Sequence, residues 1–485
     1  MSTPRTSRGP SLARIALGVL AVVLLALSAC AIRVPAPAAA PEPPPAWIEL
    51  GPAPMARAVV APGAGCPELT VDGRAQPMTL RIAAGTIARR PTANDPGGPA
   101  KALAFPVDVC ESPVAAAART LRIGDRALPA IVAEPRRILV LGDTGCRLKG
   151  SSVQACNDPA QWPFPRLART AADLKPDLVI HVGDYHYRET PCPADAPGCT
   201  GSPWGYGWDV WNTDFFAPAA PLLAAAPWVF VRGNHEECAR AGQGWFRLLA
   251  PEPWTSARSC DLAADDDDAN FSPPYAVPLG AGRQLIVFDS AAAGWKPLDR
   301  SHPHDAAAWN AYTAHWQAVA ALAARPGVHS VFASHHPVLA FAPDPRPDAT
   351  EPFPGTASLL ETMKAQNGPA LYPPGIALAL HGHVHLFEAL AFADGHPATI
   401  VAGHGGDLRD PRLPDPLPSH ATPAPGVRPG QVTTSDAFGF LLLTRADAGP
   451  ADWNLTAYRA EGTVLTRCTI AEAGALACTP SGALH

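Results

Sequence analysis

The stretch VLGDTGCR, residues 140–147, decides the fold. An apolar run from Ile138 to Leu141 leads directly into Gly142-Asp143, the usual beginning of a metal-binding loop at the end of a strand. In many such loops a His stands two residues after the Asp and binds the same metal ion, but here Gly145 takes that place. Either the site is damaged, or the missing ligand comes from elsewhere in the chain.

The pattern of an apolar run that ends in a polar loop recurs along the second part of the chain. It appears in RILVLGD (137–143), DLVIHVGDY (177–185), PWVFVRGNHE (227–236), QLIVFDS (284–290), HSVFASHHP (329–337), IALALHGHVH (376–385) and TIVAGHGG (399–406). Ala/Leu-rich stretches such as 165–174 and 305–324, which suit helices, lie between several of these runs. The alternation predicts an α/β sheet that is buried on both faces, with ligands bound beyond the carboxyl ends of its strands.

The residues at the ends of these runs have the chemistry of metal ligands. They are Asp143, Asp184, Tyr187, Asn234, His235, His335, His383 and His385. Carboxylate, imidazole and amide donors together suit two first-row metal ions better than calcium, which avoids nitrogen, or a thiolate zinc site. Two ions about 3.5–4 Å apart can share a carboxylate and clamp a phosphate for in-line attack.

Five short motifs in this order resemble the calcineurin-like metallophosphoesterases, and most closely their purple acid phosphatase branch. They are GD (142–143), GDYHY (183–187), GNHE (233–236), SHHP (334–337) and GHVH (382–385). The resemblance covers roughly residues 140–385. It implies a β-sandwich flanked by helices, in an α/β/β/α arrangement, over residues 137–485.

The resemblance also implies a role for each motif residue. Asp184 would bridge two metal ions, Asp143 and His385 would bind the first, and Asn234, His335 and His383 would bind the second. His235 would contact the phosphoryl group without binding metal and protonate the leaving oxygen. The implied reaction is hydrolysis of a phosphomonoester by a metal-bound hydroxide, without a covalent intermediate.

The vacant position at Gly145 is explained by the same branch, in which a Tyr three residues after the bridging Asp binds the first metal. Here that residue is Tyr187. A phenolate donor favours Fe(III) in the first site, and two imidazoles with an amide suit Fe(II), Zn(II) or Mn(II) in the second. Other branches often carry an acid at the position of Tyr187, which orients the catalytic His.

Three further residues are candidates for support around the ligands. Glu236 is a guess for the missing partner of His235. His336 stands next to a ligand position, where contact with substrate and rigidity of the loop at Pro337 are equally good explanations. His404, after a late apolar run, is a candidate for the border of the pocket.

The N-terminus has the form of an export signal. Three arginines precede an uncharged apolar run from Ile15 to Leu27, which is short for a membrane span of about 20 residues. Leu-Ser-Ala-Cys at 27–30 resembles a bacterial lipoprotein signal, in which Cys30 would be lipidated. With Ala31 after it, the expected location is the outer membrane, facing the periplasm. An uncleaved anchor or a plain signal peptide remains the alternative.

The rest of the chain divides by composition. After the signal peptide (1–29), a Pro/Ala-rich tether (30–46) precedes a small β-rich domain (47–136), for which we expect a sandwich. The strand-like pieces after residue 436 are expected to complete the second half of the phosphoesterase fold. Ten cysteines remain beside Cys30, and pairing of sequence neighbours gives Cys66–Cys110, Cys146–Cys156, Cys192–Cys199, Cys238–Cys260 and Cys468–Cys478.

The expected function is thus a secreted dimetal phosphatase acting on a phosphate ester. One alternative keeps the fold but is a di-manganese or di-zinc phosphodiesterase acting on nucleotides or lipid head groups. Another is a surface binding lipoprotein with a relic metal fold. The formal charge of −6 and the absence of a basic cluster argue against nucleic-acid binding, and no sequence feature indicates an oligomeric state.

Overall fold

Short runs of Val, Ile and Leu between turn residues produce the strands that position the site. The computed structural model describes residues 44–88, 90, 101–346, 349–447, 451–471 and 473–484. All seven apolar runs that end in polar loops are strands, as predicted. The proposed signal peptide, Cys30 and the tether as far as residue 43 lie outside the described residues.

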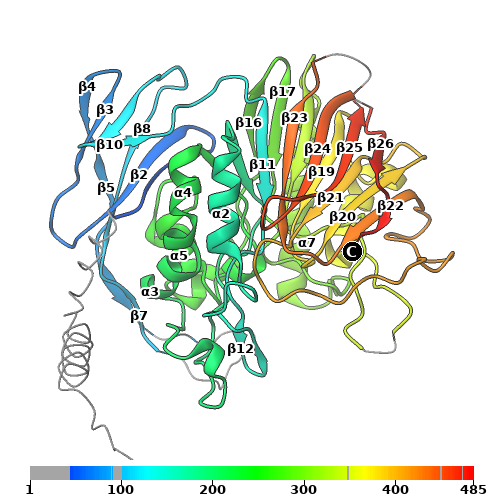
Figure 1. Cartoon of the computed structure of the whole chain (residues 1–485), viewed down its shortest axis with the longest axis horizontal. Coiled ribbons are helices and arrows are strands. Elements are labelled where there is room, and N and C mark those ends of the chain that lie inside the picture. The colour runs from blue at the N-terminus through cyan, green and yellow to red at the C-terminus, as the bar shows by residue number, and fades with distance from the viewer. Residues whose placement is uncertain are drawn as a thin grey trace, which may run out of the picture. The chain divides into compact units, whose positions relative to one another are not determined.

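The first large sheet has eleven strands and is coloured from blue to red in Figure 1, because it draws on the whole chain. Their order is β26 (Leu476–Thr479), β25 (Val464–Ala471), β24 (Ala451–Arg459), β23 (Gly439–Arg445), β11 (Arg137–Leu141), β14 (Leu178–His181), β15 (Trp228–Phe230), β1 (Ala46–Leu50), β2 (Pro54–Val60), β8 (Asp108–Pro113) and β5 (Thr79–Ile82). Strands β11, β14 and β15 are parallel, so their carboxyl ends lie at one edge of the sheet.

The second large sheet has eight strands. Their order is β16 (Tyr275–Gly280), β17 (Arg283–Val287), β18 (His329–Ala333), β19 (Ile376–His381), β21 (Ala398–Ala402), β20 (Phe387–Phe392), β22 (Pro429–Ser435) and β27 (Gly482–Ala483). Strands β17, β18, β19 and β21 are parallel and supply the other half of the predicted polar loops.

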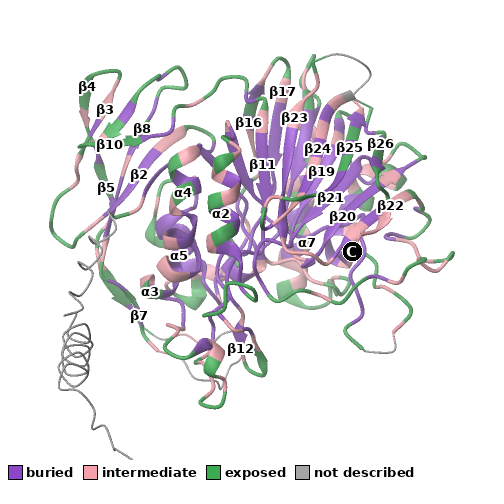
Figure 2. Ribbon diagram, in the orientation of Figure 1, coloured by how far each residue is buried: buried purple, intermediate pink, exposed green. Residues whose placement is uncertain are grey.

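The two sheets pack face to face with helices on their outer faces. Alternate residues of a strand point to opposite faces, so Val140 and Ile180 of the first sheet pack with Val331 and Leu378 of the second. The other residues of the first sheet, such as Leu139, pack on helices α2 (Phe164–Asp173), α4 (Ala217–Ala225) and α5 (Gly242–Leu248). The outer face of the second sheet is covered by α7 (Pro303–Ala323) and α8 (Ala357–Asn367). The strands are mostly buried, whereas the helices expose one side (Figure 2), which confirms the predicted α/β/β/α arrangement.

The remaining helical segments are short. They are α3 (Trp208–Trp211), the π-helical turn Asn212–Phe216, α6 (Asp266–Ala269) and the 3-10 turns Pro197–Cys199, Asn234–Glu236, Ser256–Arg258, Ala263–Asp265 and Gly368–Ala370. The two predicted helices, 165–174 and 305–324, correspond to α2 and α7. None of the helices in the described part of the chain is both long and apolar enough to span a bilayer.

The N-terminal region is rich in β-structure, as expected, but it does not stand apart from the phosphoesterase fold. Strand β1 pairs in parallel with β15, so β1, β2, β8 and β5 continue the first large sheet. The other N-terminal strands form a four-stranded sheet and a pair. They are β10 (Arg126–Leu128), β9 (Leu121–Ile123), β3 (Glu68–Val71) and β4 (Arg74–Pro77), with β6 (Gly85–Ile87) paired to β7 (Leu103–Phe105). Residues Pro44–His485 accordingly form one compact unit.

The C-terminal strands also join existing sheets. Strands β23 to β26 extend the first sheet beside β11, and only β22 and β27 join the second. The expectation that this region completes the second half of the fold is therefore corrected for β23 to β26. Strand β11 pairs with β14 along one edge and with β23 along the other. The C-terminal strands therefore join the first sheet because β23 pairs with the edge of β11 that β14 leaves open.

All five disulfides join the cysteines that are neighbours in sequence, as predicted. The Cys146–Cys156 bond closes the loop that follows Asp143. That loop carries the short hairpin β12 (Leu148–Lys149) and β13 (Ser152–Val153).

Candidate functional site

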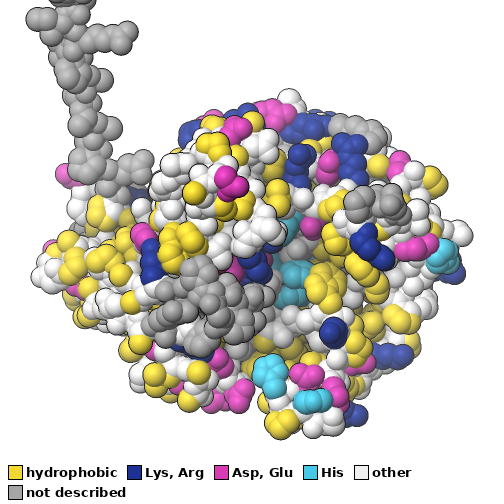
Figure 3. Space-filling model, turned by 90° about the horizontal axis from the view of Figure 1, so that it is seen from below, with side chains coloured by type: hydrophobic (Ala, Val, Ile, Leu, Met, Phe, Trp, Pro, Cys, Tyr) yellow, Lys and Arg dark blue, Asp and Glu magenta, His cyan; other side chains and the backbone are white. Residues whose placement is uncertain are grey.

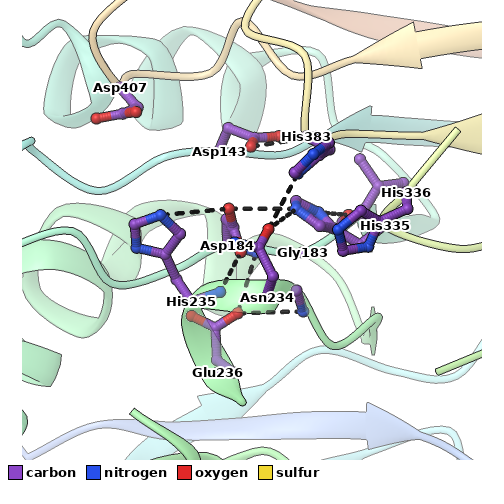
Figure 4. Close-up of polar contacts among 12 residues, drawn as sticks. Asp143, Gly183, Asp184, Asn234, His235, Glu236, His335, His336, His383 and Asp407 are labelled. Atoms are coloured by element: carbon purple, nitrogen blue, oxygen red, sulfur yellow. Dashed lines mark hydrogen bonds and ion pairs between the residues drawn. The ribbon is translucent and has the colours of Figure 1, made fainter. Parts of the chain in front are cut away.

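The polar loops at the carboxyl ends of the parallel strands of both sheets meet at one place. Asp143, Asp184 and His383 stand in the left-handed region of backbone space, with φ of 56°, 58° and 71°. Side chains other than Gly adopt this conformation rarely, and it clusters at functional sites. The chain therefore turns sharply at three of the predicted ligands, and Figure 4 shows their side chains pointing toward a common centre.

The first group of donors surrounds the hydroxyl oxygen of Tyr187. This oxygen lies 2.9 Å from Asp143 Oδ1, 2.8 Å from Asp184 Oδ2 and 3.2 Å from His385 Nε2. All four side chains are buried or nearly so. The structure thus brings together the four residues that sequence reasoning assigned to the first metal.

Gly145 lies directly against the ring of Tyr187. A Cβ atom at this position would stand 2.9 Å from Tyr187 Cδ2 and 2.8 Å from the carbonyl oxygen of Tyr185. Cβ atoms essentially never make such close contacts, so a side chain here would displace the Tyr187 loop. A His side chain at 145 and the ring of Tyr187 would therefore compete for the same space, and this protein has the Tyr.

The second group of donors surrounds the amide oxygen of Asn234. Asn234 Oδ1 lies 3.1 Å from His335 Nε2 and 3.0 Å from His383 Nδ1. Asp184 Oδ2 is 3.2 Å from His335 Nε2, and ligand atoms of Asp184, His335 and His383 lie within 4.8 Å of one another. Asp184 therefore contacts both groups, as a bridging carboxylate must.

The charges in this centre fit cations. Burial raises the pKa of Tyr187 well above its usual value, and the carboxylates of Asp143 and Asp184 raise it further. Burial also raises the pKa of Asp143. Against the effect of burial, the imidazoles of His335 and His235 hold the pKa of Asp184 well below its usual value, so this buried carboxylate favours the anion. Added positive charge would also favour the anions of Asp143 and Tyr187. The donor set is thus chemically suited to two metal ions.

Backbone carbonyls fix the orientation of two imidazoles. His335 Nδ1 lies 2.8 Å from the carbonyl oxygen of Val182, and His385 Nδ1 lies 2.9 Å from that of Leu408. An Nδ1–H that donates to a carbonyl leaves Nε2 as the free acceptor on the other side of the ring. In both residues Nε2 is the atom that faces the other proposed metal ligands.

The non-ligand His235 has a partner that the sequence did not reveal. Its Nδ1 lies 2.9 Å from Glu189 Oε1, and the same carboxylate contacts Arg240 and accepts a hydrogen bond from Tyr206 at 3.1 Å. His235 Nε2 then faces Asp184 Oδ2 at 3.9 Å. Glu189 lies two residues after Tyr187 in the same loop, and this proximity is the one signal that could have identified it.

Glu236, the other acidic residue considered as the partner of His235, does not contact His235 Nδ1, which lies next to Glu189. The carboxylate of Glu236 is buried and accepts hydrogen bonds from the backbone N–H groups of Asp184, Tyr185 and Gly233, at 2.9–3.2 Å. Burial raises its pKa to about 8. Glu236 therefore holds the loop of the bridging Asp184 rather than orienting His235.

Of the other two residues predicted to support the ligands, His336 lies next to the site and His404 does not line the cavity. The ring of His336 lies 4.1 Å from that of His383, and its Nδ1 lies 3.2 Å from Ser290 Oγ. His404 is buried away from the cavity, and neither ring nitrogen has a hydrogen-bond partner among the described residues. From the loop after β21 it is instead Asp407 that reaches the site, because its carboxylate contacts Arg147 and lies 3.4 Å from His385 Nδ1.

A cavity of about 550 Å³ opens above the donor groups. Asp184, Asn234, His235, His383 and His385 form its base, and Arg147 and Lys149 form one wall. Viewed from below in Figure 3, histidine and basic side chains are exposed in a hollow on this face. An anionic ligand can therefore reach the base of the cavity from solvent.

Comparisons with known proteins agree with this geometry. A family model described as calcineurin-like phosphoesterase matches residues 136–387, a little more than half of the chain. A search of curated proteins finds no match.

Among the solved structures that match, three cover between 70% and 90% of this chain. The purple acid phosphatase PPD1 from yellow lupin (Lupinus luteus) seeds is 14% identical, with a TM-score of 0.48 over 88% of this chain and 74% of its own. PhoD is 11% identical, with a TM-score of 0.50 over 90% and 92%. GAP50 of Plasmodium is 12% identical, with a TM-score of 0.36 over 70% and 89%. At this identity the match to PhoD supports a shared fold, and the family model supplies the assignment: the chain belongs to the calcineurin-like phosphoesterases.

Proposed function

We propose that this phosphoesterase is a phosphomonoesterase of the purple acid phosphatase type, with Tyr187 as a ligand of the first metal ion. The observation that carries the proposal is the position of the Tyr187 hydroxyl, 2.8–3.2 Å from Asp143, Asp184 and His385. The close approach of Gly145 to the same ring supports it, because a ligand at 145 and the ring of Tyr187 exclude each other.

The residues assigned to the two metal ions follow from the two donor groups. Asp143, Tyr187 and His385 would hold the first ion, Asn234, His335 and His383 the second, and Asp184 both. A phenolate favours Fe(III) in the first site, and the second set suits Fe(II), Zn(II) or Mn(II). When bound, two such ions would supply Lewis acidity and an activated water for attack on phosphorus.

The protein side chains around the cavity would position the ester and move its proton. His235, held by Glu189 at Nδ1, presents Nε2 to the base of the cavity, where it would hydrogen-bond a phosphoryl oxygen and protonate the leaving oxygen. Arg147 and Lys149 on the cavity wall would attract the phosphate dianion.

Export and lipid anchoring are part of the proposal. The leader at 1–29, with Cys30 as the lipidated residue, and the Pro/Ala-rich tether support a location in the bacterial outer membrane, facing the periplasm. Five disulfides are consistent with an oxidising compartment.

The experiment that tests the proposed function is metal analysis with a visible spectrum, combined with turnover of an aryl phosphomonoester and a matched diester. We expect iron with one further metal, a phenolate-to-iron charge-transfer band and preference for the monoester. Tyr187→Phe should abolish the band and lower iron content, because the only phenolate ligand is lost. A Tyr187→Phe variant that keeps its colour and iron would refute the ligand role, and cleavage of the diester alone would refute the monoesterase.

A further inference from the structure

One wall of the cavity is apolar, in contrast to the cationic wall of Arg147 and Lys149. We call it the aromatic wall, and it consists of Trp295, Ala342, Pro343, Pro345, Phe353 and Pro354. Proline has no N–H group, and neither Ala nor Phe offers a side-chain hydrogen bond. This wall therefore suits an apolar surface, and the indole N–H of Trp295 is its side-chain hydrogen-bond donor.

Two aromatic side chains of this wall are unusually exposed. Trp295 is 45% exposed and Phe353 is 46% exposed. The other large apolar side chains that are comparably exposed among the described residues are all Leu or Val. Large apolar side chains that remain exposed beside a binding cavity are typical of ligand contacts. The ring of Trp295 also lies 5.0 Å from that of His383, so the wall begins directly at the base of the cavity.

Both aromatic residues are held by backbone hydrogen bonds. Phe353 exchanges two of these with Ala342, with N···O distances of 2.7 and 3.0 Å. The loop of Trp295 is tied to α8, because Gly294 N–H donates to Ser358 Oγ at 2.9 Å and Ser358 N–H donates to the carbonyl of Gly294 at 3.2 Å. The backbone that carries both rings is thus anchored before a ligand arrives, which lowers the entropy cost of binding.

We infer that Trp295 and Phe353 are specificity residues that select phosphate esters with a flat, apolar ring on the leaving oxygen. Such a ring would stack on the aromatic wall while the phosphate lies at the base, beside His235 and the basic side chains. This inference rests on the proposed function, since it assigns the substrate class of the same site. Aromatic pairs of this kind favour offset or edge-to-face contact.

The test is calorimetric binding of two ligands that cannot be hydrolysed, phenylphosphonate and methylphosphonate, to the metal-loaded protein. Both carry the same charged group, and only one carries a ring. We expect phenylphosphonate to bind more tightly, and Trp295→Ala and Phe353→Ala each to weaken it about two- to tenfold while methylphosphonate binding is unchanged. Trp295→Phe should retain most of the preference.

The matched control is Leu262→Ala, because Leu262 is 66% exposed and lies outside the cavity. This variant should bind both phosphonates as the parent protein does, and metal content should be the same in all variants. Equal affinity for the two phosphonates in the parent protein, an equal loss of both in the wall variants, or no binding of either would overturn the inference. A protein that prefers phenylphosphonate but cleaves only diesters would support the aromatic wall and contradict the proposed monoesterase.

Discussion

Gly145 has no side chain, and the ring of Tyr187 lies in the space that a side chain at this position would occupy. We predict that Gly145→Ala displaces the Tyr187 loop, because the new methyl group would stand 2.9 Å from the ring. Metal affinity should fall by about tenfold or more, as it does when groups that orient ligands are removed. Equilibrium dialysis with iron measures the change.

The control for this prediction is Gly85→Ala. A Cβ atom at Gly85 would have no other heavy atom within 4 Å, and the φ of Gly85 is not positive, so the same substitution should leave metal affinity unchanged. An unaltered affinity in Gly145→Ala would show that the Tyr187 ring has room to move.

Glu189 is the second residue whose role can be tested singly. We predict that Glu189→Gln lowers kcat for an aryl phosphate by about 10–100-fold, because the neutral amide holds His235 less firmly and no longer favours its protonated form. Metal content should be unchanged, since the contacts of the Glu189 side chain are with His235, Arg240 and Tyr206 rather than with the proposed ligands. Comparison of pH–rate profiles checks the role: a variant with the parent profile and kcat would exclude it.

At the scale of elements, a buried arginine of β2 adds to the sheet pairing that joins β1 and β2 to the rest of the protein. Arg57 is fully buried, its Nη1 lies 2.5 Å from Glu49 Oε2, and its guanidinium donates to the carbonyl groups of Leu248 and Ala250 at 3.0 and 2.7 Å. The two carbonyl groups belong to the end of α5 and the segment after it. The N-terminal hairpin and this segment are therefore joined by charge-assisted hydrogen bonds.

We predict that Arg57→Met lowers the free energy of unfolding by about 3–5 kcal/mol, because it leaves Glu49 buried without its ion-pair partner. Chemical denaturation followed by tryptophan fluorescence measures the change. The matched variant Arg74→Met removes an exposed arginine of β4 and should change stability little. A loss below about 0.5 kcal/mol for Arg57→Met would mean that the pair contributes nothing net.

The elements also show which features the sequence could predict. Apolar runs followed by Asp, Asn or His predict both strands and site, because strand, turn and ligand are local in sequence. The pairing of β1 with β15 joins residues 49 and 228, and no local pattern contains that information. Glu189 and Asp407 were missed for the same reason, since their role depends on the folded positions of His235 and Arg147.

For the whole molecule, the pH dependence of unfolding depends on carboxyl groups that fold in their neutral form. Glu388 on β20 is buried, accepts a hydrogen bond from the N–H of Phe341 at 3.1 Å, and has its pKa raised by burial from 4.5 to about 8. The native state therefore keeps a proton that the unfolded chain releases, and the contribution of Glu388 to stability should fall as pH rises from 4.5 through 8.

We predict that Glu388→Gln reduces this fall by roughly 3–5 kcal/mol, because the amide oxygen still accepts the hydrogen bond and no proton is lost. Urea denaturation of the metal-free protein at pH 5 and pH 8.5 measures the effect without a contribution from metal binding. Glu68→Gln, at an exposed position of β3, should leave the parent pH dependence intact. The same slope in Glu388→Gln as in the parent would contradict the assignment.

The order of strands in the first sheet has a consequence for how this protein can be divided. Strand β15 lies between β14 and the N-terminal β1, while β11 lies between β14 and the C-terminal β23. A fragment limited to the five motifs would leave the backbone of β11 and β15 open on one side each, as two new edges prone to aggregation. The catalytic segment is thus not a transferable module, and fusions or insertions belong at the outer strands β5 and β26, where the sheet already ends.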